Sequence, residues 1–169
     1  SDLANIKIAK EMGVTGVMQP FVRDHSDLEC VKEALREAGA EDIRLFAKIE
    51  NMDGVRKLEK LLPAADEIVI ARGDLGNAVH LWDLPGVQRQ ISEKCRAAGK
   101  PFMVVTQMLA SMERSPVPTR AEVNDIFHAV MDGAASIMVT GETAVGDYPV
   151  EVIRYMVNTV RSAEKKENR

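Results

Sequence analysis

Two segments of the sequence end in ionisable side chains whose types could support chemistry. The apolar run from Ile43 to Phe46 leads to Lys48 and Glu50, and the run from Ile68 to Ala71 leads to Arg72-Gly73-Asp74. Two carboxylates beside a cationic side chain suit a hard cation such as Mg²⁺ or Mn²⁺, which keeps coordination positions for water or an anionic substrate. These segments are therefore the candidate active site.

The elements around these residues must bring them together. Apolar side chains recur at helical spacing between Val55 and Leu62, so the pattern indicates strand, helix, strand. Side chains alternate along a strand, so Lys48 and Glu50 are expected to share one face, as are Arg72 and Asp74. If the strands are parallel neighbours, about 4.8 Å apart, both carboxylates can reach one ion. The alternative is a cluster of surface salt bridges at the strand ends.

Composition excludes several classes of function. The chain has 169 residues with a net charge of -4, and its four Phe, two Tyr and one Trp are too few for a base-stacking surface, so nucleic acid is not an expected partner. No apolar run approaches the roughly 20 residues that a membrane helix needs. Cys30 and Cys95 lack the spacing of a metal or disulfide framework. We expect a soluble protein of the reducing cytoplasm that makes no membrane contact.

Strand and helix patterns alternate along the whole chain. A helix is expected from Asp2 to Met12, and five apolar runs follow, each succeeded by a helical pattern; the runs are Val14–Met18, Ile43–Phe46, Ile68–Ala71, Phe102–Val105 and Ile137–Val139. Ser26 with Glu29, and Thr119 with Glu122, have the spacing of capping boxes at helix starts. We expect residues 1–163 to form one domain and residues 164–169 to form a charged tail.

This alternation predicts an α/β fold with a parallel sheet and right-handed crossovers. Every predicted strand finishes in polar or ionisable residues, and in a (β/α)8 barrel the functional residues gather at the carboxyl ends of the strands. We therefore predict a partial TIM (β/α)8 barrel of about five parallel βα units preceded by a helix, since a full barrel needs about 250 residues. Thr140 and Glu142 after the last strand are further site candidates, the alternative being a helix-entry turn at Gly141.

Five short motifs occur in a fixed order. They are Lys48-Ile49-Glu50-Asn51, Ala71-Arg72-Gly73-Asp74-Leu75-Gly76, Thr106-Gln107-Met108-Leu109, Pro118-Thr119-Arg120-Ala121-Glu122 and Gly141-Glu142-Thr143-Ala144. In this order and spacing they resemble the second half of the catalytic barrel of the pyruvate kinase family, in a truncated or divergent form. The resemblance covers the chain from Asp2 to about Met156, and ordered motifs are far more specific than any one of them.

The resemblance implies an enzyme that transfers a phosphoryl group between phosphoenolpyruvate and ADP. It implies Mg²⁺ or Mn²⁺ as the divalent cation and K⁺ in the complete family site. Lys48 matches the lysine beside the transferred phosphoryl group, and Glu50 and Asp74 match the carboxylates that hold the metal.

Other matching positions belong to the pyruvate end of the substrate. Thr106 matches a threonine that contacts this end and is a second catalytic candidate. Ala71, Arg72, Gly73 and Asp74 match the substrate-binding segment, in which the backbone around Ala71 and Gly73 makes contacts. Phosphoryl transfer is catalysed mostly by positioning and electrostatic stabilisation, so a lysine and a metal ion suit it.

Departures from the family pattern leave two alternatives. Pro20 replaces a serine at the first strand end, and a nucleotide-covering domain lies outside this sequence. A metal-dependent lyase or decarboxylase that forms pyruvate enolate without ADP is one alternative, and a non-catalytic assembly module of the same fold is the other. Because an incomplete barrel leaves strand edges uncovered, we expect a homo-oligomer or a second chain that completes the barrel.

Overall fold

Five short strands form one parallel sheet in the order in which they occur along the chain. The computed structural model describes residues 2–167. The strands are β1 (Gly16–Gln19), β2 (Arg44–Ile49), β3 (Glu67–Ala71), β4 (Phe102–Val105) and β5 (Ser136–Met138). Each strand pairs in parallel with the next one in the sequence. This confirms the predicted α/β fold and is consistent with a partial TIM barrel.

Helices occupy the connections between the strands. They are α1 (Asp2–Ala9), α2 (His25–Glu37), α3 (Met52–Arg56), α4 (Leu58–Leu61), α5 (Arg72–Ala78), α6 (Leu84–Ala97), the 3-10 turn η1 (Ala110–Glu113), α7 (Arg120–Met131), α8 (Gly141–Ala144) and α9 (Pro149–Glu167). The predicted helix between β2 and β3 is thus two short helices, and α9 continues into the predicted charged tail as far as Glu167. None of the helices within residues 2–167 is long and apolar enough to cross a bilayer.

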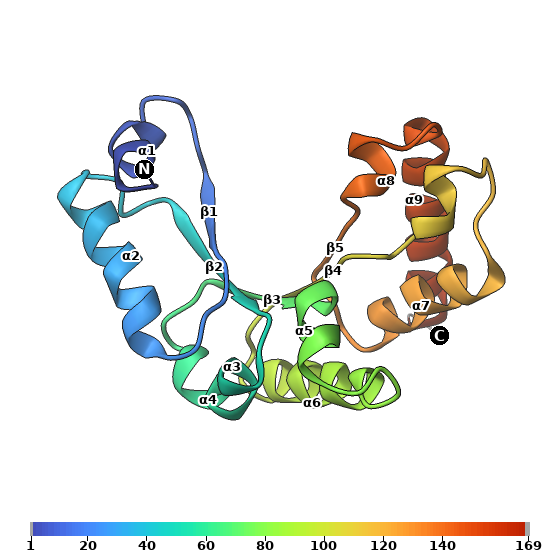
Figure 1. Cartoon of the computed structure of the whole chain (residues 1–169), viewed down its shortest axis with the longest axis horizontal. Coiled ribbons are helices and arrows are strands. Elements are labelled where there is room, and N and C mark those ends of the chain that lie inside the picture. The colour runs from blue at the N-terminus through green and yellow to red at the C-terminus, as the bar shows by residue number, and fades with distance from the viewer. Residues whose placement is uncertain (1, 168–169) are drawn as a thin grey trace.

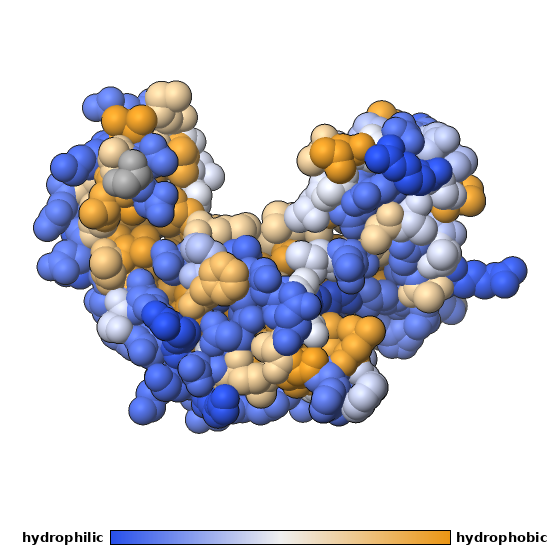
Figure 2. All heavy atoms as spheres, in the orientation of Figure 1, coloured by the Kyte–Doolittle hydropathy of each residue, from blue (hydrophilic) through white to orange (hydrophobic). Residues whose placement is uncertain are grey.

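The sheet is curved, as Figure 1 shows, and its larger helices lie along the outer side of the arc. The end formed by α1, β1 and α2 stands apart from the end formed by α7, α8 and α9. Figure 2 shows the surface hollowed between these two ends. The inner face of the sheet lines this hollow, and it is called the concave side below.

The two faces of the strands are buried differently. On β2, Leu45, Ala47 and Ile49 are at most 1% exposed and pack in the main core beneath the helices. The alternate residues Phe46 and Lys48 lie on the inner face and are partly buried. This period of two is what a strand requires, and it places Lys48 on the concave side.

A polar cluster lies at the amino-terminal end of the inner face. The buried carboxylate of Glu67 accepts a hydrogen bond from Arg44 Nη2 at 2.9 Å and another from Ser136 Oγ at 2.6 Å. These bonds join β2, β3 and β5. In barrels this end of the strands serves stability, so we assign the cluster a structural role.

The predicted capping box of Ser26 and Glu29 is wrong. Helix α2 begins at His25, so Asp24 is the N-cap residue, and its carboxylate accepts a hydrogen bond from the Ser26 backbone N–H at 3.0 Å. Asp27 completes the box, because its side chain accepts a hydrogen bond from the Asp24 backbone N–H. Aspartate caps as well as serine does, so the helix takes the earlier start.

The predicted capping box of Thr119 and Glu122 at the start of α7 is confirmed. Glu122 also accepts hydrogen bonds from the backbone N–H and the hydroxyl of Ser111, at 2.7 and 2.6 Å. Burial alone would raise the pKa of Glu122, but the hydrogen bonds from Ser111 and Thr119 hold it below its ordinary value. The carboxylate therefore fixes the segment after β4 against α7.

Replacing Glu122 with alanine is expected to lower the free energy of unfolding at pH 7 by about 1–2 kcal/mol, since a cap and two hydrogen bonds are lost. The pKa of Glu122 is depressed in the folded state, so its stabilisation is present above the unfolded pKa of about 4.3. It is lost as the pH falls through the folded value. Urea unfolding at pH 7 and pH 3 checks this, with exposed Glu33→Ala as control. An equal deficit for Glu122→Ala at both pH values would contradict the assignment.

Candidate active site

The carboxyl end of β2 carries a nearly buried ion pair. Lys48 Nζ lies 2.9 Å from Glu50 Oε1, and the Glu50 side chain is only 2% exposed whereas that of Lys48 is 27% exposed. The second carboxylate oxygen of Glu50 accepts a hydrogen bond from the Phe21 backbone N–H at 2.7 Å. Lys48 and Glu50 are therefore in contact, although Glu50 follows the last residue of β2, and the segment after β1 fixes the orientation of the carboxylate.

Backbone strain is concentrated beside this carboxylate and at the end of β4. Within residues 2–167, the non-glycine residues with positive φ are Phe21 at 52°, Thr106 at 75° and Gln107 at 53°. Phe21 follows β1, and Thr106 and Gln107 follow β4. Such conformations cost on the order of 1–3 kcal/mol and persist where surrounding contacts hold them, typically at functional sites.

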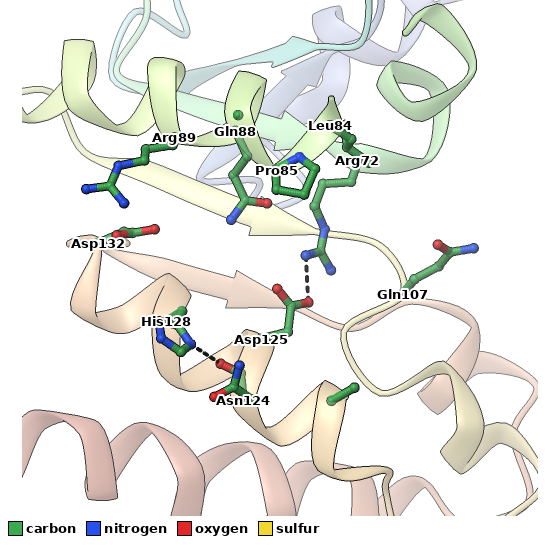
Figure 3. Close-up of a pocket in the computed structure, with 12 residues that line it drawn as sticks. Arg72, Leu84, Pro85, Gln88, Arg89, Gln107, Asn124, Asp125, His128 and Asp132 are labelled. Atoms are coloured by element: carbon green, nitrogen blue, oxygen red, sulfur yellow. Dashed lines mark hydrogen bonds and ion pairs between the residues drawn. The ribbon is translucent and has the colours of Figure 1, made fainter. Parts of the chain in front are cut away.

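The carboxyl end of β3 differs from the prediction. The strand ends at Ala71, and Arg72 and Asp74 belong to the first turn of α5, so these two side chains do not share a strand face. Figure 3 shows the Arg72 side chain directed toward Asp125 on α7. Asp74 is exposed, and no residue in the described range pairs with its carboxylate. A strand that leads directly into a helix loses its alternation at that point, which explains the difference.

Thr106 lies next to this first turn of α5. The strand register pairs Ala71 with Val105, so the residues that follow each of them are also adjacent. The Gly73 backbone N–H donates a hydrogen bond to Thr106 Oγ1 at 2.9 Å. The structure thus joins two of the predicted substrate-binding elements, the segment after β3 and the threonine after β4.

Thr140 and Glu142 lie beyond the end of β5, which stops at Met138, so they do not share a face of that strand. The buried Glu142 carboxylate accepts backbone N–H groups from Thr140 at 2.7 Å and from Leu109 at 3.1 Å. These bonds support the helix-entry alternative for Glu142, and they also tie the loop after β4 to α8.

The donor set suits a divalent cation of the magnesium type. Glu50 and Asp74 carry carboxylate groups, and carboxylate oxygens are ligands that Mg²⁺ and Mn²⁺ prefer. Within residues 2–167 no three His, Cys, Asp or Glu side chains converge as a metal site. Mg²⁺ commonly uses only one or two protein carboxylates and keeps water and substrate oxygens as its other ligands, so two carboxylates fit this group.

The cysteines lie outside the candidate site and form no disulfide. Cys30 is exposed, whereas burial raises the pKa of the Cys95 thiol to about 12. The Cys95 thiol is therefore neutral at physiological pH and is not a nucleophile.

Two groups that position side chains of the candidate site were not predicted from the sequence. The Phe21 backbone N–H orients Glu50 across 29 positions of sequence, and Asp125 pairs with Arg72 across 53 positions. A backbone group has no signature in the sequence, and Asp125 is a common acidic residue on a helix. Only the packing of α7 against the sheet reveals its partner.

Comparisons with known proteins identify the family of this chain. The family model described as "Pyruvate kinase, barrel domain" matches residues 1–153. The chain belongs to the pyruvate kinase family. It is 42% identical to a pyruvate kinase of Bacillus licheniformis over 99% of this chain and 28% of that protein. It is also 42% identical to a pyruvate kinase of Dictyostelium discoideum, over 99% of this chain and 33% of that protein.

A pyruvate kinase of Debaryomyces hansenii is 43% identical over 97% of this chain and 32% of its own length. The chain therefore spans about a third of the length of these curated pyruvate kinases, and the matched third is barrel. The resemblance seen in the sequence motifs is confirmed at the level of family and fold.

Proposed function

We propose that this protein binds phosphoenolpyruvate and a divalent cation at the carboxyl ends of its strands and acts in phosphoryl transfer to ADP. The observation that carries the proposal is the Lys48–Glu50 pair, a nearly buried charge pair at the strand end where barrel enzymes have their active sites. Its setting in a pyruvate kinase barrel domain supports the same assignment.

Lys48 supplies positive charge to the transferring phosphoryl group in this proposal. Its side chain is 27% exposed on the concave side, so the ammonium group is accessible to an anion. Glu50 and Asp74 would hold Mg²⁺ or Mn²⁺, which when bound neutralises negative charge on the phosphoryl group and the enolate. The Phe21 N–H keeps the Glu50 carboxylate from rotating, so less conformational freedom is lost when the ligands bind.

The pyruvate end of the substrate would lie against the segment after β3 and Thr106. The Thr106 hydroxyl already accepts a hydrogen bond from Gly73, which leaves its own proton for donation to a substrate oxygen. The backbone of Ala71 and Gly73 borders the same place. The Arg72 guanidinium makes internal contacts, so its share in substrate binding would come from its backbone.

A second candidate reaction uses the same residues without ADP. Decarboxylation or carbon–carbon cleavage that yields the pyruvate enolate needs a metal, a lysine and a proton donor. Pro20, at a position where the family has a serine, favours this reaction because it removes a hydroxyl from the edge of the site.

The free edge of the sheet at β1 supports a proposal about partners. Met18 and Phe21, at and after the edge strand β1, are 39% and 56% exposed, and a cavity of about 770 Å³ lies among α1, β1 and α2. Apolar surface at the unpaired edge of a strand favours the addition of further strands, either from a second chain or from another copy of this one. We infer a barrel completed in this way, acting in the cytoplasm with K⁺ in the completed site.

The experiment that tests the function is a titration of the protein with Mn²⁺ and oxalate, a mimic of the pyruvate enolate, in buffer with K⁺. Oxalate binding that depends on Mn²⁺ is expected. Pyruvate-forming assays with and without ADP then separate the two reactions. If oxalate binds no more tightly with Mn²⁺ than without it, the enolpyruvate site is not built by this chain.

A further inference from the structure

The guanidinium group of Arg72 joins three elements beside the candidate site. Arg72 lies at the start of α5, and its side chain is only 12% exposed. Nη1 donates to Asp125 Oδ2 on α7 at 2.6 Å, and Nη2 donates to the backbone carbonyl of Thr106 at 2.7 Å. The side chain therefore connects α7 to the residue that follows β4.

The backbone of Thr106 has an unfavourable conformation that surrounding contacts must hold. Its φ of 75° lies in the left-handed region, which β-branched residues rarely adopt. Gln107 follows with a φ of 53°, so two strained residues are adjacent. Two contacts hold Thr106 in this conformation: the Arg72 guanidinium on its carbonyl and the Gly73 N–H on its hydroxyl. Both contacts come from the start of α5, so the placement of Arg72 affects the placement of the Thr106 hydroxyl.

Asp125 restricts where Arg72 can go. Arg72 borders a cavity of about 610 Å³ between α6 and α7, which is also lined by Gln88, His128 and Asp132. Figure 3 shows this cavity, with the Arg72–Asp125 bond at one side and Asp132 at the far end of α7. An arginine side chain has many rotamers, and this open space would admit several of them. The ion pair with Asp125 selects the rotamer that also reaches the Thr106 carbonyl.

We propose that Asp125 is a positioning residue that acts through Arg72 on Thr106. The inference rests on the proposed function, which assigns Thr106 to the pyruvate end of the substrate. Asp125 itself touches neither substrate nor metal in this account. It holds the Arg72 guanidinium, the guanidinium holds the strained Thr106 backbone, and the hydroxyl stays aimed at the ligand.

The test compares Asp125→Ala, Asp125→Asn and Arg72→Lys with Asp132→Ala, a control that removes an acid from the same cavity but not from Arg72. Two quantities are measured on each protein. The first is the Thr106 Cα and Cβ chemical shifts in ¹³C-threonine-labelled protein, which report its backbone conformation. The second is the affinity for oxalate in the presence of Mn²⁺.

Asp125→Ala and Arg72→Lys are expected to shift the Thr106 signals and to weaken oxalate binding about tenfold, the usual effect of losing a support behind a ligand-binding group. Lysine cannot reach both acceptors at once, so it does not replace the guanidinium. Asp125→Asn keeps an acceptor and is expected to have a smaller effect. Asp132→Ala is expected to leave both quantities unchanged.

A double-mutant cycle distinguishes positioning from general destabilisation. In a Thr106→Val background, where no hydroxyl remains to be aimed, Asp125→Ala should cost little further affinity. Equal losses in both backgrounds would overturn the proposal, as would unchanged Thr106 signals in Asp125→Ala. If Asp125→Ala does not fold, the same two measurements on Asp125→Asn test the proposal. If the Thr106 signals move while the unmutated protein binds no oxalate, the positioning contact stands and the proposed function fails.

Discussion

Glu50→Gln is expected to lower the affinity for Mn²⁺ and oxalate by at least about 100-fold, because even outer contacts of a metal ligand contribute about 10–100-fold. The change removes the negative charge while it keeps the shape and one oxygen. Glutamine is a poor ligand for a hard cation compared with a carboxylate. The loss should therefore appear in binding without loss of the fold.

The matched control for this change is Glu67→Gln. Glu67 is also a buried glutamate on the inner face, but it lies at the opposite end of the strands, where it pairs with Arg44 and Ser136. Isothermal titration of both variants with Mn²⁺ and oxalate gives the comparison. If Glu67→Gln and Glu50→Gln lose equal affinity, the site does not lie at the carboxyl end of β2.

Lys48→Met is expected to lower the free energy of unfolding by about 3 kcal/mol, the lower end of what removal of one partner from a buried ion pair costs. The Glu50 carboxylate would still accept the hydrogen bond from the Phe21 N–H, but it would lose its neighbouring positive charge. Because this side chain is only 2% exposed, water cannot replace that charge. Methionine preserves the aliphatic stem, so lost packing contributes little. Urea unfolding at pH 7 measures the change.

The double variant Lys48→Met with Glu50→Gln should recover most of that stability. A neutral amide in the place of the carboxylate no longer needs a cation, so the two changes are strongly non-additive. If the double variant is as unstable as the sum of the single ones, the instability comes from packing at β2 and not from an unpaired charge.

The sequence alone determined the elements and the family. Apolar runs separated by helical patterns specified all five strands, because the strands of a parallel sheet covered by helices are rich in apolar residues and the helices that cover them are amphipathic. Lys48 and Glu50 could be placed on one side of the chain in advance, since alternation along β2 is a local rule, and the structure brings the two side chains into contact just past the strand end. Local rules of this kind act over a few residues and can be read from a single chain.

The tertiary structure decided the contacts between distant segments. The end of β3 at Ala71 and the start of α5 depend on packing, so the shared face expected for Arg72 and Asp74 was wrong. The cap of α2 moved to Asp24 for a similar reason, as Asp24 and Ser26, two positions apart, can both cap and the geometry of the entering chain selects one. Sequence periodicity does not resolve such choices because both alternatives have nearly the same local free energy.

The strained Thr106, the Phe21 N–H on Glu50 and the Arg72–Asp125 pair belong to the tertiary structure alone. Each joins groups at least 29 positions apart or depends on a backbone conformation that the side chain itself disfavours. The residue types therefore led to the chemistry that we propose for this protein. The packing of α5 and α7 around the strand ends decided which of these atoms are held in place.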